Sequence, residues 1–177
     1  MDSRIAYTAL VLCVGLERLA EVATSRRHAA WSAERGGVEL GAGHYAIMVA
    51  LHVGLLVGCL LETWLLQRPF LPWLGWPALV VAVACQGVRW WCVRTLGGHW
   101  NIRILVVPGM TPVERGPYRW VHHPNYVAVA AEGVALPLVH TAWITALLFT
   151  VADVPLLLHR ARLEDVALGR APRSSVA

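Results

Sequence analysis

Long apolar runs alternate with short polar segments along this chain. A helix that spans a bilayer needs about 20 mainly apolar residues. Five stretches approach or reach that length, at residues 4–24, 45–66, 78–96 and 124–139, and from the turn at 140–141 to 168. The pattern predicts an all-α, polytopic integral membrane protein with about five transmembrane helices. We expect the whole chain, residues 1–177, to form one membrane-embedded domain.

The composition supports a membrane environment. The chain is 57% hydrophobic with a mean hydropathy of +0.54, which is too apolar for an ordinary soluble domain. The net charge of +4 does not indicate nucleic acid, because the arginines lie in short segments between apolar runs. The four cysteines and the histidines lack the spacing of a metal site. We therefore expect a lipid membrane as partner, and neither nucleic acid nor metal.

The arginines also predict an orientation. With five spans, three arginine-rich segments fall on one side of the membrane: the loop after the first helix, residues 89–119, and the C-terminal segment from 160 to 173. Positive loops face the cytoplasm. We expect a bacterial plasma membrane protein with its N-terminus outside and its C-terminus and active site in the cytoplasm.

Candidate chemistry is concentrated in residues 115–126, the densest run of polar, aromatic and helix-breaking residues. The hairpin of the last two helices brings the charged segment 159–165 to the same membrane face. Arg160 and Glu164 are four residues apart and share one face of a helix. A pocket there would be polar at its cytoplasmic mouth and apolar toward the bilayer, which suits a water-soluble co-substrate that meets a lipid-like acceptor.

Three motifs in this region resemble a known signature. Gly116-Pro-Tyr118, His123-Pro-Asn-Tyr126 and Arg160-x-x-x-Glu164-Asp165-x-x-Leu168 are similar in order and spacing to motifs of the isoprenylcysteine carboxyl methyltransferase family, a membrane-embedded group that uses S-adenosylmethionine (SAM). The matched region covers residues 97–168. The added elements at 96–100 and 107–109 are most similar to small bacterial members that O-methylate alkylpyrones or alkyl phenolics.

The resemblance implies a cytoplasmic SAM site formed by the loop before the fourth helix and the C-terminal end of the fifth. The implied cofactor-binding residues are Arg103, Met110, Val113, Gly116, Pro117, Tyr118, His123, Pro124, Asn125, Tyr126 and Glu164. It also implies that Arg160 faces the acceptor, where a guanidinium can stabilise an oxyanion. The predicted activity is methyl transfer to a carboxyl, phenol or enol oxygen of a lipophilic molecule, such as an alkylpyrone, an alkyl phenolic or a prenylcysteine.

Other site residues are proposed from the sequence itself. His122 or His123 is a candidate base. Glu132 and Asp153 are candidates for the acceptor pocket because carboxylates inside apolar helices are costly. Each also has a structural interpretation: His122 can be a solvated residue at a helix start, and the carboxylates can pair with arginine or histidine between helices. We expect His52 to be a hydrogen-bonded core residue.

Two other functions fit the same pattern. A membrane reductase of the sterol-reductase type would bind NADPH in place of SAM. A non-enzymatic membrane scaffold would bind neither cofactor, and its Arg160 and Glu164 would form only a solvated ion pair.

Overall fold

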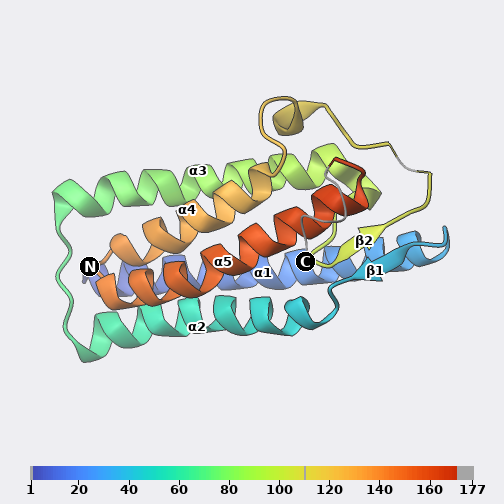
Figure 1. Ribbon diagram of the computed structural model, residues 1–177. Helices are drawn as coiled ribbons and strands as arrows, with labels where there is room; N and C mark the ends of the chain where they lie inside the picture. The colour runs from blue at the N-terminus through green and yellow to red at the C-terminus, as the bar shows by residue number, and fades with distance from the viewer. Residues whose placement is uncertain (1, 110, 171–177) are drawn as a thin grey trace.

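A computed structural model describes residues 2–109 and 111–170 as a bundle of five long helices with a small sheet at one end (Figure 1). The elements in chain order are α1 Ser3–Ala33, β1 Val38–Leu40, α2 Gly43–Leu65, α3 Pro72–Leu96, the short 3-10 helix η1 Gly97–His99, β2 Ile104–Val106, the 3-10 helix η2 Gly116–Arg119, α4 Pro124–Leu138 and α5 Trp143–Ala167. The predicted helical architecture is confirmed.

Helix α1 differs most from its predicted bounds, because it continues nine residues past the expected end at residue 24. Contacts with the segment after α3 hold this extension. The Ser25 hydroxyl donates to Asn101 Oδ1 (2.7 Å), and His28 Nδ1 lies 2.8 Å from the Trp100 carbonyl oxygen. Tertiary hydrogen bonds therefore extend a helix where its sequence turns polar.

Three helical stretches are long and apolar enough to cross a bilayer: Gly43–Leu65, Pro72–His99 and Trp143–Ala167. Helix α4 has 15 residues, which is shorter than the roughly 20 that a bilayer core requires. Helix α1 is long enough but carries Glu17, Arg18 and Glu21 along its middle. The described residues thus support a membrane-spanning protein, while the expected count of about five spans is not confirmed.

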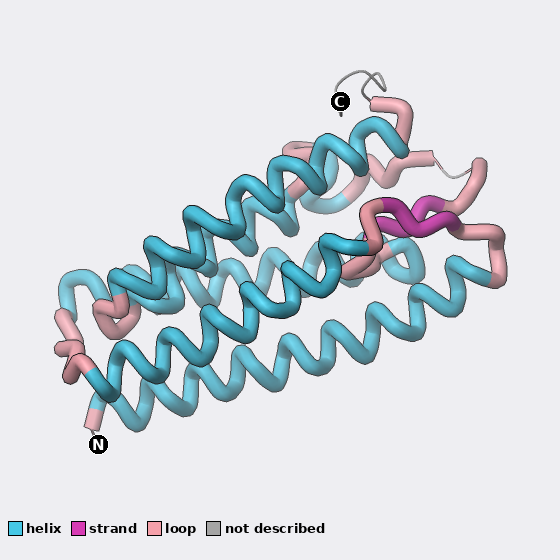
Figure 2. The backbone as a smooth tube through the Cα atoms, turned by 60° about the horizontal axis from the view of Figure 1, so that its bottom comes forward, coloured by secondary structure: helices cyan, strands magenta, loops and turns pink. Residues whose placement is uncertain are grey.

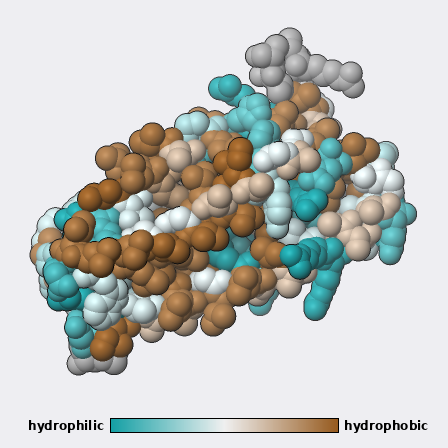
Figure 3. Space-filling view, turned by 90° about the horizontal axis from the view of Figure 1, so that it is seen from below, coloured by the Kyte–Doolittle hydropathy of each residue, from teal (hydrophilic) through white to brown (hydrophobic). Residues whose placement is uncertain are grey.

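The surface of the bundle is apolar where a lipid would touch it. Figure 3 shows hydrophobic residues over the middle of one face and hydrophilic residues gathered toward its ends. Large side chains such as Leu16, Leu147 and Val151 are mostly exposed. This surface is unlike that of a soluble bundle, which turns its large apolar residues inward.

One end of the bundle holds the chain's N-terminal end together with the α2–α3 and α4–α5 connections (Figure 1). Glu62 closes this end from α2. Its carboxylate accepts hydrogen bonds from the backbone N–H groups of Ile144 (3.1 Å) and Thr145 (2.7 Å), and from the Thr145 hydroxyl (2.8 Å). Arg68 adds an ion pair at 2.7 Å. A side chain of α2 therefore caps the first turn of α5.

The opposite end holds the sheet, η2 and the C-terminal end of α5 (Figure 2). β1 and β2 pair antiparallel, with Val38 opposite Val106 and Leu40 opposite Ile104. The mostly β-branched run at residues 104–107 predicts a short extended segment, and β2 forms there. Its partner β1 was not predicted, because an alternation of only three residues inside a polar loop is too short to indicate a strand. The small sheet is an exception to the all-α prediction.

Candidate active site

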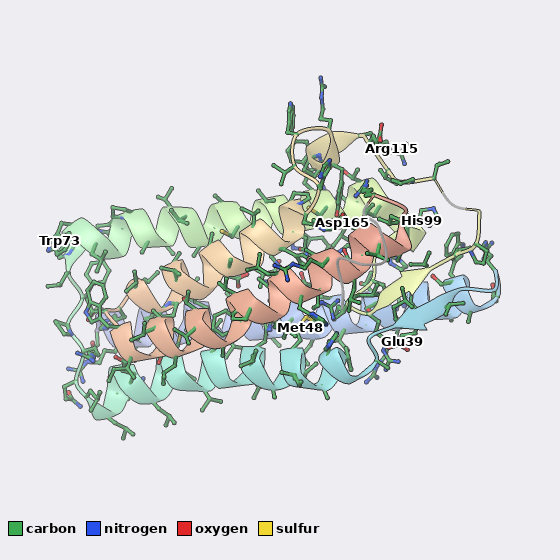
Figure 4. All side chains as sticks on the ribbon, in the orientation of Figure 1. Glu39, Met48, Trp73, His99, Arg115 and Asp165 are labelled. Carbon is green, nitrogen blue, oxygen red and sulfur yellow. The ribbon has the colours of Figure 1, made fainter. Side chains whose placement is uncertain are left out.

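A cavity lined by both polar and apolar side chains, here called the loop cavity, opens at the sheet end of the bundle. Its walls are β2, the segment before α4, the first turn of α4 and the last turns of α5. Figure 4 labels His99 and Asp165 at this end, with Trp73 at the far end. The sequence-predicted residues that line the loop cavity are Arg103, Val113, Tyr118, His122, His123, Asn125, Tyr126 and Glu164. The structure thus brings together residues from three separate segments.

Three predicted cofactor residues, Gly116, Pro117 and Pro124, support this cavity but do not line it. Gly116 has φ of +59°, and a Cβ there would lie 2.6 Å from Thr95 Oγ1 of α3. Only glycine fits this turn without displacing α3. Pro124 begins α4, where a missing N–H costs nothing. Met110, also predicted to bind the cofactor, lies outside the described residues.

A hydrogen-bonded network joins α4 to α5 in the cavity wall. The Tyr126 hydroxyl donates to Glu164, and the His123 ring stacks on the Tyr126 ring with centroids 5.4 Å apart. His123 Nε2 lies 3.0 Å from Asp165 Oδ1, and its Nδ1 lies 3.4 Å from Glu164 Oε2. Burial disfavours a charged His123, but its hydrogen bonds to the two carboxylates and their negative charges outweigh it and raise the pKa of this histidine.

Arg103 lines the loop cavity, yet its guanidinium is already engaged. It pairs with Glu39 of β1 at 3.0 Å and lies over the Tyr45 ring, 4.7 Å from the ring centroid. These contacts tie the strand β1 to the start of β2, which forms one wall of the cavity. The arginine therefore also positions the cavity wall. His122, in contrast, is exposed at the mouth of the cavity.

A second cavity, here called the bundle cavity, lies between the helices beside the first. Side chains of α1, α2, α3, α4 and α5 line it, and most of them are apolar, including Leu19, Val49 and Leu157. Trp100, Asn101, Asn125 and Tyr126 line both cavities. The loop cavity and the more apolar bundle cavity therefore share one wall.

Arg160 lines the bundle cavity from the buried face of α5 and is 2% exposed. It donates to the Ile102 carbonyl oxygen (2.7 Å), and its guanidinium carbon lies 5.9 Å from the centroid of the Tyr126 ring. Across residues 2–109 and 111–170, no carboxylate lies within ion-pair distance of Arg160. A buried cation without a carboxylate is costly unless an anion joins it.

Two more arginines line the bundle cavity, but carboxylates compensate their charges. Glu21 accepts hydrogen bonds from Arg89 Nη2 and from Arg18 Nη1, each at 2.6 Å. Glu132 accepts from Gln86 (2.9 Å) and lies 3.3 Å from Arg18. Arg18 and Arg89 were not predicted as site residues, although charged residues within apolar helices were a usable signal.

The two carboxylates proposed for an acceptor pocket line neither cavity. Glu132 pairs with Arg18 and Arg89, as its structural interpretation predicted. Asp153 is fully buried, and neither of its carboxylate oxygens has a hydrogen-bond partner among the described residues. The described residues also contain no cluster of three or more histidine, cysteine, aspartate or glutamate side chains that could hold a metal ion.

Comparisons with known proteins agree with this geometry. Residues 78–170 match the family described as "Isoprenylcysteine carboxyl methyltransferase (ICMT) family", and this stretch includes all three motifs. A Bacillus subtilis (strain 168) protein, named "Uncharacterized protein YpbQ", is 37% identical over 160 residues, which are 90% of this chain and 94% of that protein. No solved structure gives a significant match.

The matched region contains the loop cavity, the wall that the cavities share, and Arg160. Members of the matched family are methyltransferases that generally use SAM. Together with the apolar spans, the match assigns this protein to a class of enzymes that work in membranes. The chain belongs to the isoprenylcysteine carboxyl methyltransferase family and is a membrane-spanning methyltransferase.

Proposed function

We propose that this protein transfers a methyl group from SAM, bound in the loop cavity, to an oxygen of a lipophilic small molecule, bound in the bundle cavity. One observation carries the proposal: the loop cavity, with its polar and charged side chains, and the more apolar bundle cavity share the wall formed by Trp100, Asn101, Asn125 and Tyr126. Methyl transfer requires the nucleophile and the methyl donor in line and in contact, so adjacent sites supply much of the rate.

The residues of the loop cavity fit SAM. The Glu164 carboxylate can pair with the ammonium group of the cofactor. Asn125 Oδ1 is buried without a hydrogen-bond partner among the described residues and can accept from a cofactor N–H. The stacked rings of His123 and Tyr126 offer an aromatic face to a purine. When bound, SAM supplies an electrophilic methyl group on a sulfonium sulfur.

The residues of the bundle cavity fit a lipid-like acceptor. Apolar side chains surround its tail, and the guanidinium of Arg160 can stabilise negative charge on its reactive oxygen. Leu19, Val49 and Val53 line the cavity and are also exposed on the outer surface of α1 and α2. We propose that the acceptor enters from the bilayer between these two helices.

We assign the sheet end of the bundle to the cytoplasm. The end of α1 with the loop after it, the end of α3 with the segment before α4, and the end of α5 all lie at this end, and they carry the arginine-rich segments. A cytoplasmic loop cavity would draw SAM from the compartment that contains it. Cysteine substitution followed by labelling with a membrane-impermeant thiol reagent tests this orientation: Glu34→Cys should be protected in intact cells and reactive after lysis.

Calorimetry on detergent-purified protein tests the cofactor. Wild type should bind SAM saturably, and Glu164→Ala should weaken binding at least tenfold, because it removes the charge partner of the ammonium group. Glu34→Ala is the matched control, since Glu34 is an exposed carboxylate that lines neither cavity. Failure of folded wild type to bind SAM would contradict the proposal. Binding of NADPH in its place would favour the alternative function, a membrane reductase.

A further inference from the structure

We propose that Arg170 binds the carboxylate of the methionine part of SAM, so that Glu164 and Arg170 together hold the two opposite charges of that part in the loop cavity. The assignment rests on the proposed function and deepens it, because it concerns the charged end of the same cofactor site. Both residues line the loop cavity. Arg170 lies outside the three motifs and was not predicted as a site residue.

The cap of α5 places Arg170 at the loop cavity. Gly169, just past the end of the helix, has φ of +70° and donates its N–H to the Val166 carbonyl oxygen (3.1 Å). The next N–H, that of Arg170, donates to the Asp165 carbonyl oxygen (2.7 Å). These two hydrogen bonds form a Schellman motif, in which a residue with positive φ turns the chain back across the helix end. The motif therefore fixes the backbone from which the Arg170 side chain reaches the cavity.

Two arginines line the loop cavity, and they differ in whether a carboxylate already compensates their charge. Arg103 pairs with Glu39 at 3.0 Å. Arg170 has no carboxylate within ion-pair distance in the part of the chain that the structure describes. Its positive charge is therefore available to an anionic group of a ligand.

The negative side of the cavity is equally simple. Among the described residues that line it, only Glu164 carries a carboxylate, and it stands in the last turn of α5. The methionine part of SAM has an ammonium group and a carboxylate on one carbon atom, so its charges need partners of opposite sign at the same end of the site. Glu164 before the helix end and Arg170 just after it provide such a pair.

The electrostatics of a helix end explain why the carboxylate requires an arginine there. The last carbonyl groups of a helix carry partial negative charge, which favours the cofactor ammonium and disfavours its carboxylate. The guanidinium of Arg170 offsets this charge, and its planar fork can hold both carboxylate oxygens. An arginine at this position also stabilises the helix itself. A test must therefore measure discrimination between ligands, which a structural role would leave unchanged.

Calorimetry with two forms of the cofactor, on the detergent-purified full chain, makes this distinction. Decarboxylated SAM lacks the carboxylate but keeps the ammonium, the sulfonium and the adenosine. Wild type should bind SAM about tenfold more tightly, the effect expected of one charge-assisted hydrogen bond. Arg170→Gln should abolish this preference by weakening SAM binding, while the affinity for decarboxylated SAM should not fall. Arg170→Lys, which keeps the charge but loses the planar fork, should retain part of the preference.

Two further variants separate Arg170 from its neighbours. Glu164→Gln should weaken the binding of both compounds, because both carry the ammonium group, and should keep the preference for SAM. Arg162→Gln is the matched control, since Arg162 is an exposed arginine of α5 that lines neither cavity. This variant should bind both compounds as wild type does.

Equal binding of the two compounds by wild type would overturn the role of Arg170 and leave the proposed function standing. The same holds for an Arg170→Gln variant that keeps the preference. Loss of the preference in Arg103→Gln alone would assign the carboxylate to Arg103 instead. Failure of folded wild type to bind either compound would remove both the proposed function and the role of Arg170.

Discussion

Two buried charged side chains toward opposite ends of the bundle, Glu62 and Arg160, differ in how their charges are satisfied. At the end with the α4–α5 turn, the Glu62 carboxylate accepts from two backbone N–H groups, a hydroxyl and Arg68. Among the described residues toward the sheet end, Arg160 has no carboxylate partner and Asn125 Oδ1 has no donor. Polar groups that satisfy one another hold the helices together, whereas unsatisfied groups lining cavities are available to ligands. By this difference, Glu62 belongs to the groups that hold the bundle together, whereas Arg160 and Asn125 belong to the candidate site.

The largest effect on stability is expected at Glu62, at the end with the α4–α5 turn. Glu62→Ala should lower the free energy of unfolding by about 2–4 kcal/mol, because it leaves buried N–H groups and Arg68 without their acceptor. Thermal unfolding in detergent measures the loss. SAM binding by the folded fraction should be unchanged. A variant that keeps its stability would show that water replaces the carboxylate there.

At Arg160, a substitution is expected to raise the free energy of unfolding. Arg160→Met should raise the free energy of unfolding by about 1 kcal/mol, because it removes a buried cation that has no carboxylate partner while preserving most of the side-chain volume. Methyl transfer to an amphiphilic acceptor should be lost. SAM affinity should stay near the wild-type value. A fall in stability together with intact activity would assign Arg160 to the architecture.

A third prediction concerns His123 in the loop cavity, whose protonation should make SAM affinity depend on pH. The pKa of His123 is raised in the folded protein, so its contribution to stability is complete below its ordinary pKa, about 6.5, and is lost as pH rises through the raised value. The cofactor ammonium would compete with protonated His123 for Glu164. SAM affinity should therefore increase as pH rises through this pKa, and His123→Gln should flatten the profile measured by calorimetry. A wild-type profile as flat as that of the variant would contradict this competition.

The smallest effect is expected at the sheet. Glu39→Gln removes the partner of Arg103 in a largely exposed ion pair, which should cost at most about 1 kcal/mol of stability. Because β2 forms a wall of the loop cavity, SAM affinity should fall by a small factor. Glu34→Gln, which breaks the exposed pair with Arg35, is the matched control and should change neither quantity.

Much of the architecture could be predicted from the hydrophobic pattern and from the prolines and glycines at helix ends. Residues 45–66 were expected as a helix and form α2 within two residues at each end, because an apolar run of that length has one low-energy conformation in a membrane. Pro124 and the Gly97-Gly98 pair mark a helix start and a helix end as expected. The extension of α1 and the partner strand β1 depend on contacts with residues 100–106, which no local pattern encodes.

The candidate site also has a part that could be predicted from the sequence and a part that could not. The motifs at 116–126 and 160–168 could be recognised in the sequence because they are short and local, and their family is confirmed. The bundle cavity could not be recognised, because Arg18, His52 and Arg89 come from three helices that meet only after folding. The sequence by itself determined a membrane protein with a methyltransferase signature. Only the tertiary structure decided which polar side chains find partners and which remain available, since hydrogen bonding between helices depends on where each helix packs.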